Sequence, residues 1–208
     1  MKAVWYEQNG AANAVFHVGE LPCPEIGLGE VSVKMVTSGV NPSDCKGRKG
    51  RPLAGPKVIP HSDGAGVIDA VGEGVDTSRV GERVWIWNGQ WQRPFGTSAE
   101  YIVLPSALAV HLPDNTSFEA GACIGVPLLT AIQALSYLGD INGKTILVTG
   151  AANAVGHYVT QVAVRDGGAK VIATVGSSSK AEHAIKAGAF AAIDYKNESV
   201  AERVLELT

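Results

Sequence analysis

The chain has 208 residues, with 17 basic and 20 acidic side chains and a formal net charge of −3 at neutral pH. This length can bury a real hydrophobic core, in one large domain or two small ones. The charge lacks the basic surplus that nucleic-acid binding requires, so we expect a small-molecule ligand and no nucleic-acid partner.

The N-terminal segment MKAVWYEQNG lacks the apolar core of a signal peptide, and no apolar run reaches the length of a membrane span. Cys23, Cys45 and Cys123 are odd in number and far apart, and none belongs to a C-x-x-C pair. This usage fits a reducing compartment better than a disulfide framework. We therefore expect a cytoplasmic protein with no membrane partner.

Residues 1–116 have the texture of an antiparallel β domain. The apolar side chains of Val31, Val33 and Met35 alternate with period two, and fifteen of the 25 glycines lie in this part of the chain. Glycine and proline separate the short apolar segments EVSVKMV, GAGVIDAVG, ERVWIW and AEYIVLP. Frequent tight corners of this kind favour a barrel-like fold.

Residues 117–208 have a different pattern. Ser117 suits an N-cap, and Pro127 is expected to kink or restart the helix that follows. Strands and helices are then predicted in alternation in TILVTG, AVGHYVTQVAVRDG, KVIATVG, SKAEHAIKAGA, AAIDY and VAERVLEL. This alternation predicts a Rossmann-type, doubly wound parallel sheet covered by helices on both faces. Only the first of its two βαβαβ halves is present, so we expect a domain truncated in its C-terminal half.

The turn in TGAANAVGHYV has two glycines where a phosphate-cradling loop usually has three. Gly150 and Gly156 hold the outer positions, and Asn153 and Ala154 lie between them. Asparagine tolerates left-handed backbone angles, and its side chain adds a donor toward phosphate. A helix starting near Ala154 would direct the N–H groups of Ala154, Val155 and Gly156 at an anion. The alternative is a strand-turn-helix without a ligand, but the βα unit that follows favours a nucleotide.

The end of the second strand of this unit indicates which nucleotide binds. A fold that selects NAD places Asp or Glu there, whereas this chain has Gly176 and Ser177, with Lys180 close behind. Serine hydroxyls and an ammonium group suit a 2′-phosphate, so we predict NADPH as the cofactor, bound by these three residues. The alternative is that Ser179 and Glu182 form a capping box and that Lys180 is merely solvated.

Seven blocks in order resemble the quinone oxidoreductase (zeta-crystallin-like) branch of the medium-chain dehydrogenases/reductases. These blocks are TSGVNPSDCKGRKG, PHSDGAGVIDAVGEGV, VGERVWIW, GTSAEYIVLP, GVPLLTAIQAL, ILVTGAANAVG and TVGSSSKAEHAIKAGA. The resemblance implies a GroES-like β-barrel domain at 1–116 and a Rossmann domain at 117–208, with substrate bound between them. It also implies NADPH-dependent hydride transfer to a quinone or an α,β-unsaturated carbonyl, in a full-length homodimer.

The zinc-dependent relatives in this family carry a metal-binding Cys at the position of Asn41 and a His-Glu pair at 62–63. This chain has Asn41, Ser62 and Asp63 there, it lacks the four-cysteine structural zinc lobe, and its five histidines show no ligand-like spacing. The resemblance therefore implies a zinc-free enzyme, and we expect no metal. His61 is interpreted as a hydrogen-bonded structural residue rather than a proton donor.

The resemblance also assigns site residues. Asn41 and Asp44 match cleft residues near the nicotinamide and the substrate, and they are the implied catalytic pair. Thr130 matches a residue at the nicotinamide end of the cofactor, and Tyr195 matches a contact to the adenosine phosphate. The structural alternatives are a turn-forming Asn before Pro42, a helix-capping Asp, a buried helix Thr and a strand-end aromatic.

The substrate wall departs from the family pattern, because Lys46 and Pro52 stand where some quinone-reducing members carry tyrosines. Trp85, Trp87 and Trp91 either line a slot for an aromatic acceptor or belong to the core, which is the commoner role of strand tryptophans. The carbonyl or the nicotinamide amide would be held by Asn41, and the proton would come from solvent. A second hypothesis, favoured by the altered glycine loop, is an NADPH-binding structural or regulatory protein without turnover.

Overall fold

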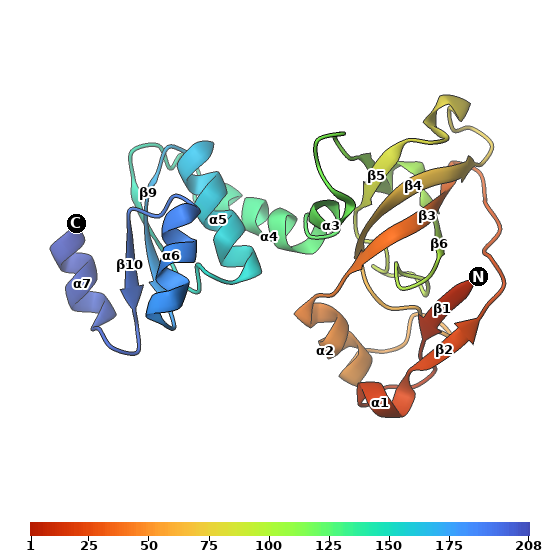
Figure 1. Ribbon diagram of the computed structural model, residues 1–208, viewed down its shortest axis with the longest axis horizontal. Coiled ribbons are helices and arrows are strands. Elements are labelled where there is room, and N and C mark those ends of the chain that lie inside the picture. Colours follow the sequence, from red (N-terminus) through yellow and green to blue (C-terminus); the bar gives the residue numbers. More distant parts are fainter. The chain divides into compact units, whose positions relative to one another are not determined.

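The computed structural model describes residues 1–208, which divide into two compact units, Met1–Val126 and Pro127–Thr208 (Figure 1). This division lies later than the change of texture at residue 116. The reason is that Phe118, Ala122 and Ile124 pack with Ala65 and Leu112 in one apolar cluster. The short helix that follows residue 116 is therefore part of the first unit.

The first unit is built on antiparallel strands, as the sequence predicts. Five strands form a sheet in the order β6-β3-β4-β5-β7, and two more form a separate pair, β1-β2. The strands are β1 (Lys2–Trp5), β2 (His17–Glu20), β3 (Glu30–Gly39), β4 (Asp63–Val71), β5 (Arg83–Ile86), β6 (Tyr101–Pro105) and β7 (Ala109–His111). The predicted segments EVSVKMV, GAGVIDAVG, ERVWIW and AEYIVLP supply β3, β4, β5 and β6.

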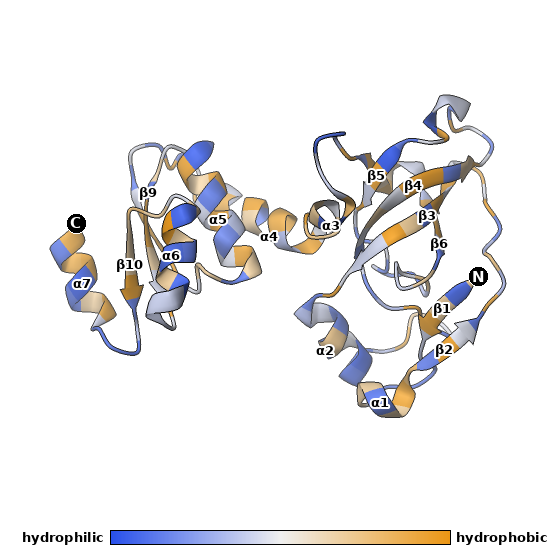
Figure 2. Ribbon diagram, viewed as in Figure 1, coloured by the Kyte–Doolittle hydropathy of each residue, from blue (hydrophilic) through white to orange (hydrophobic).

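One core cluster of the first unit is formed by buried residues of β3, β4, β5, β6 and β7. Val31 and Val33 on β3 are fully buried, as period-two alternation requires, and they pack with Ile68, Ile102 and Leu104. Figure 2 shows the corresponding apolar colouring along β3 and β4. Burial of these branched side chains is the main favourable contribution to the stability of the unit.

Helix α2 (Pro42–Gly50) was foreseen only in the alternative that Asp44 caps a helix, because its sequence PSDCKGRKG has no apolar face, and Figure 2 shows it as largely hydrophilic. Its ends explain why it forms. Pro42 is preorganised for the first helical position, and the carboxylate of Asp44 accepts the N–H of Asn41 at 2.7 Å. Arg48 and Lys49 lie in the last turn, where the helix dipole favours cations.

The other helices of this unit are short: α1 (Ala12–Val15), α3 (Phe118–Gly121) and two 3-10 turns, Thr77–Arg79 and Ser106–Leu108. Ser117 caps α3 as predicted, since its hydroxyl accepts the N–H of Ala120 at 3.2 Å. Pro127 lies in the first turn of α4 (Gly125–Ser136), so it restarts a helix rather than kinking one.

The second unit contains the predicted parallel sheet, in the order β10-β9-β8. Its elements alternate as β8 (Thr145–Val148), α5 (Ala154–Arg165), β9 (Lys170–Val175), α6 (Ser178–Lys186), β10 (Ala191–Asp194) and α7 (Val200–Leu207). The central strand β9 is buried from Val171 to Val175, as expected for a strand covered by helices. No helix in the structure has the length and apolarity needed to cross a bilayer.

Candidate functional site

The turn between β8 and α5 has the tight geometry of a phosphate loop. Gly150 has a φ of 64°, a left-handed angle that glycine adopts without steric cost. A Cβ on Gly156 would lie 2.4 Å from the carbonyl oxygen of Gly150, so only glycine allows the helix to pack this closely against the turn. The N–H of Ala151 donates to the carbonyl of Thr174 at 3.1 Å, which anchors the turn to β9.

The N-terminus of α5 is left open for an anion. Asn153 is its N-cap, but the side chain makes no capping hydrogen bond. The first intrahelical bond is donated by the N–H of His157 to the carbonyl of Asn153 at 2.8 Å. The N–H groups of residues 154–156 precede that bond and have no backbone or side-chain acceptor. These donors and the positive end of the helix dipole fit a pyrophosphate.

Asn153 does not take the left-handed conformation for which the sequence made it a candidate. Its φ is −92°, in the extended region, and Gly150 supplies the positive φ instead. A helix N-cap normally has extended angles, because its carbonyl must begin the helical ladder. The side chain of Asn153 remains available for the predicted phosphate contact.

The end of β9 brings two predicted cofactor residues together. A Cβ on Gly176 would lie 2.8 Å from the hydroxyl of Tyr195, so the tyrosine lies directly over the glycine. The N–H of Tyr195 donates to the carbonyl of Val175 at 3.2 Å, which fixes the tyrosine backbone at the strand end. Tyr195 is half exposed, and its ring is therefore accessible to a ligand at this edge of the sheet.

The capping box considered for Ser179 and Glu182 is not formed. The N-cap of α6 is Ser177, and the Ser177 and Ser179 hydroxyls hydrogen bond to each other at 3.0 Å. The carboxylate of Glu182 pairs with Lys186 at 2.7 Å instead. Lys180 is exposed in the first turn of α6, and its ammonium group forms no ion pair. It is therefore free to bind a phosphate.

A groove of about 390 Å³ in the second unit is lined by four of the predicted cofactor-binding residues. It is lined by Gly150, Asn153, Val155 and Gly156, and by apolar residues of α4 and β8. Six predicted cofactor residues do not line it: Thr130, Ala154, Gly176, Ser177, Lys180 and Tyr195. Thr130 is exposed on α4, so its alternative as a buried helix threonine is wrong.

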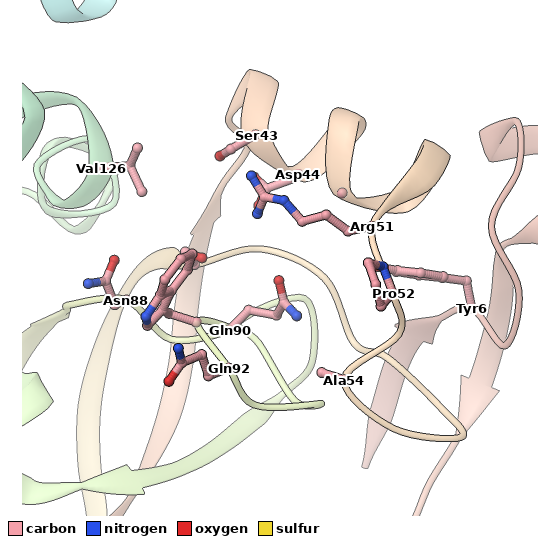
Figure 3. Close-up of a pocket in the computed structure, with 13 residues that line it drawn as sticks. Tyr6, Ser43, Asp44, Arg51, Pro52, Ala54, Asn88, Gln90, Gln92 and Val126 are labelled. Carbon is pink, nitrogen blue, oxygen red and sulfur yellow. The ribbon is translucent and has the colours of Figure 1, made fainter.

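The first unit contains a larger cavity, of about 620 Å³ (Figure 3). One wall comes from α2 and the residues after it, including Asp44, Arg51 and Pro52. The opposite wall is the loop at 88–92, which follows β5 and carries an indole and several carboxamides. Pro52, noted above as a departure from the family pattern, is thus part of the lining, whereas Lys46 is not.

The two implied catalytic residues occupy different positions. Asp44 lines the cavity, whereas Asn41 is only 7% exposed and does not line it. The side-chain amide of Asn41 donates to the carboxylate of Asp63 at 2.7 Å. The same carboxylate accepts the N–H of Val126 at 2.9 Å. Asn41 therefore links α2 to the start of β4 and to the N-terminal turn of α4.

Burial raises the pKa of both carboxyl groups in this region. Desolvation raises the pKa of Asp63, while hydrogen bonds from Asn41 and Val126 oppose the rise. Desolvation likewise raises the pKa of Asp44, opposed by the Asn41 N–H and by the charge of Arg51. Each carboxylate is thus held by donors in surroundings that disfavour its charge.

His61 has the structural role expected for it. Its Nδ1 lies 2.9 Å from the hydroxyl of Ser38, which in turn lies 2.8 Å from the hydroxyl of Thr97. Burial lowers the pKa of His61, which favours the neutral ring. Its φ of 77° is unusual for a residue with a side chain and points to local backbone strain.

Of the three tryptophans, Trp85 belongs to the core, Trp91 lines the cavity and Trp87 does neither. Trp85 is on β5 and packs against the apolar cluster of Ala65 and Leu112. Trp87 and Trp91 follow the strand and are 41% and 58% exposed, and Trp91 lines the cavity. The core interpretation therefore holds for Trp85 only.

Several cavity residues were not predicted from the sequence. Tyr6, Arg51, Asn88 and Gln92 line the cavity from segments with no recognisable motif. Asp63, which does not line the cavity, was noted only as an altered zinc-ligand position. The unusually polar sequence of the loop, NGQWQR, was the one available signal for Asn88 and Gln92. No group of three or more His, Cys, Asp or Glu side chains is placed to hold a metal ion.

Two protein families match the chain. The Alcohol dehydrogenase GroES-like domain family matches residues 27–114, and the Zinc-binding dehydrogenase family matches residues 154–208. Among curated proteins, the chain is 39% identical over 186 residues to a quinone oxidoreductase of Pseudomonas aeruginosa, covering 88% of this chain and 56% of that protein. It is 31% identical over 210 residues to the chloroplastic NADPH-dependent alkenal/one oxidoreductase of Arabidopsis thaliana, covering 96% and 54%.

Solved structures of dehydrogenases and quinone oxidoreductases superpose on the chain. A quinone oxidoreductase of Pseudomonas syringae pv. Tomato superposes with a TM-score of 0.87 at 36% identity, over 99% of this chain and 62% of that one. The Escherichia coli quinone oxidoreductase complexed with NADPH gives 0.84 at 28%, over 100% and 62%. An NAD-dependent alcohol dehydrogenase gives 0.90 at 33%, over 100% and 67%.

The two matched families, a GroES-like domain and then a dehydrogenase domain, follow the chain in the same order as its two units. The chain belongs to the medium-chain dehydrogenase/reductase family, in the quinone oxidoreductase branch that its sequence resembles. It spans about half the length of the curated relatives it matches.

Proposed function

We propose that the complete protein is an NADPH-dependent oxidoreductase that reduces a quinone or an α,β-unsaturated carbonyl without a metal. The observation that carries this proposal is the open N-terminus of α5 beside Gly150 and Gly156, where three backbone N–H groups lack acceptors. Relatives whose names include quinone oxidoreductase and NADPH-dependent alkenal/one oxidoreductase support the same reaction class.

The residues present fit the dinucleotide. The N–H groups at 154–156 would bind its pyrophosphate, and Lys180 and Ser177 would bind the 2′-phosphate. The absence of Asp or Glu at the end of β9 removes the usual partner of an unphosphorylated ribose. Tyr195 over Gly176 would contact the adenosine end, and Thr130 would serve the nicotinamide end, as the family resemblance implies.

When bound, NADPH would supply the hydride for an electrophilic carbon of the acceptor and so be oxidised to NADP⁺, and water would supply the proton that completes the reduction. The first unit orients the acceptor. Asp44 lines its cavity, and Asn41 fixes α2 by donating to Asp63 and to Asp44. We propose that Asn41 acts chiefly through this positioning and that the acceptor contacts Asp44 and its neighbours.

Zinc independence is part of the proposal. Asn41, Ser62 and Asp63 offer an amide, a hydroxyl and one carboxylate that is already hydrogen bonded, which is a poor donor set for zinc. A quinone or enone delocalises its own developing negative charge, so the reaction does not need a Lewis acid. A homodimer and a cytoplasmic location, both expected from the sequence, also remain proposals.

The experiment is steady-state oxidation of NADPH by the complete protein with a panel of quinones and enones, with and without a chelator. We expect turnover with both acceptor classes and no loss after chelation. Cofactor binding without turnover of any acceptor would instead support the structural or regulatory role. Loss of activity with the chelator, restored by zinc, would contradict the metal-free proposal.

A further inference from the structure

The cavity of the first unit carries one charged residue of each sign. Asp44 and Arg51 are the only charged residues of its lining. They do not form an ion pair, although the charge of Arg51 acts on Asp44. The rest of the lining combines serine, asparagine and glutamine side chains with apolar surface, so the cavity can hold an acceptor that has both polar and apolar parts.

The backbone of Arg51 is held by hydrogen bonds, whereas its guanidinium makes none within the protein. Its N–H donates to the carbonyl of Gly47 at 3.0 Å, and its carbonyl accepts from the side-chain amide of Asn9 at 3.0 Å. The guanidinium makes no hydrogen bond or ion pair, and Figure 3 shows it beside Ser43 and Asp44. A planar guanidinium presents a fork of donors that matches a carboxylate with two parallel hydrogen bonds.

Tyr6 provides a second donor to the same cavity. It is only 5% exposed, and backbone hydrogen bonds with Val58 at 2.9 and 3.0 Å hold it in place. Its ring packs edge-on against Phe16 at a centroid distance of 6.0 Å. Its hydroxyl makes no hydrogen bond within the protein, and Tyr6 lines the cavity, so the hydroxyl can bond to a ligand there.

The loop opposite is held in a strained shape. Asn88 and Gln92 have φ values of 51° and 56°, and their side-chain amides make no hydrogen bonds. Two hydrogen bonds hold the loop in place. The N–H of Gly89 donates to the carbonyl of Ser62 at 2.8 Å, and the guanidinium of Arg93 donates to the carbonyl of Asn88 at 3.2 Å. Strain of this kind persists where the surroundings enforce it, and it clusters at ligand sites.

We propose that this cavity binds an acceptor carrying a carboxylate, with the guanidinium of Arg51 as its counter-ion and the Tyr6 hydroxyl as a further donor. The proposal rests on the proposed function and names its substrate class: an enone or quinone with an anionic substituent. The amides of Asn88 and Gln92 would hydrogen bond the polar remainder of the acceptor. Asp44, the other charged residue of the lining, lies in surroundings that disfavour its charge, which reduces its repulsion of an anionic acceptor.

The test is a binding comparison between a keto acid and its neutral ester, which differ in charge but not in the ketone. The chain of residues 1–208 is titrated with 4-oxopentanoate and with methyl 4-oxopentanoate, and binding is followed by nuclear magnetic resonance. We expect the acid to bind at least about tenfold more tightly than the ester, as one charge-assisted contact predicts. Equal affinities would overturn the proposal.

Variants locate the contact. Arg51→Met should remove the preference for the acid and leave binding of the ester within about twofold, while Tyr6→Phe should weaken acid binding by about threefold to tenfold. Lys49→Met is the matched control, because Lys49 is an exposed cation in the last turn of α2 that does not line the cavity. An equal loss of acid binding in Lys49→Met would mean general electrostatic attraction and would overturn the assignment.

Turnover by the complete protein separates this inference from the proposed function. The acceptors are trans-4-oxopent-2-enoate and its methyl ester, which share one activated double bond. Reduction of both at equal kcat/KM would contradict the carboxylate site while supporting the oxidoreductase. Selective, Arg51-dependent binding of the acid without reduction of either acceptor would support the carboxylate site and contradict the oxidoreductase.

Discussion

The side-chain amide of Asn41 donates a 2.7 Å hydrogen bond to the carboxylate of Asp63, and both residues are buried. This bond joins the N-cap of α2 to the first residue of β4. Asp63 also accepts the N–H of Val126 at 2.9 Å, so one carboxylate holds three segments that are far apart in the sequence. The part of the cavity lining contributed by α2 depends on this arrangement.

Asn41→Ala should destabilise the chain, because it leaves the buried carboxylate of Asp63 with one donor fewer. We expect the free energy of unfolding to fall by about 1–3 kcal/mol, measured by urea denaturation at pH 7. Asn115→Ala, at an exposed position, serves as the control and should change it by less than about 0.5 kcal/mol. Similar values for the two variants would mean that the Asn41–Asp63 bond contributes little.

Asp44→Asn should stabilise the chain at neutral pH. Burial raises the pKa of Asp44 above its ordinary value of 3.8, so the folded state binds this proton more tightly than the unfolded state. Stability therefore falls as pH rises from 3.8 through the raised pKa, and the loss persists above it. Asparagine keeps an acceptor for the N–H of Asn41 and carries no charge.

The expected gain in the free energy of unfolding for Asp44→Asn is roughly 0.5–2 kcal/mol at pH 7, vanishing at low pH where wild-type Asp44 is protonated. Urea denaturation at a series of pH values measures it. Asp114→Asn, at an exposed position, is the control variant. A gain of equal size at pH 3 and pH 7 would contradict the electrostatic cause.

Gly156→Ala should open the turn before α5. The added Cβ would lie 2.4 Å from the carbonyl oxygen of Gly150, so helix and turn must separate. We expect a loss of about 1–3 kcal/mol in stability by thermal or urea denaturation. NADPH affinity of the complete protein, from cofactor fluorescence, should fall by at least about tenfold, since the phosphate donors move.

Gly50→Ala is the matched control, because a Cβ at Gly50 meets no atom within 4 Å. It lies at the end of α2, and alanine there should change stability by less than about 1 kcal/mol and leave cofactor affinity unaltered. Wild-type NADPH binding by Gly156→Ala would show that the turn does not contact the phosphates.

The fold was largely predictable because its signals are local. Apolar alternation marks β3, and continuous apolar runs bounded by glycine mark β8 and β9. Helix α2 was foreseen only as an alternative because it is held by its caps and by the buried bond from Asn41 to Asp63, and a contact between residues 22 positions apart leaves no periodic trace. The boundary between the two units lies later than residue 116 for a similar reason, since α3 packs on β4 through Gly121 and Ala65.

The candidate site was predictable where a short motif carries it and not where distant segments meet. Gly150, Gly156 and Lys180 lie within two adjacent βα turns, and one stretch of sequence therefore contains them. Tyr6, Arg51 and Asn88 come from three separate segments and meet only in the folded cavity. Their residue types, taken singly, are common on any surface.

The most direct test of the central claim is the ratio of NADPH to NADH affinity in the complete protein and in Lys180→Ala. We predict that the wild type prefers NADPH by about tenfold to hundredfold, and that Lys180→Ala loses this preference with little change for NADH. Lys186→Ala, on the same helix but paired with Glu182, should keep it. Equal affinities for the two nucleotides in the wild type, or an unchanged ratio in Lys180→Ala, would contradict the account.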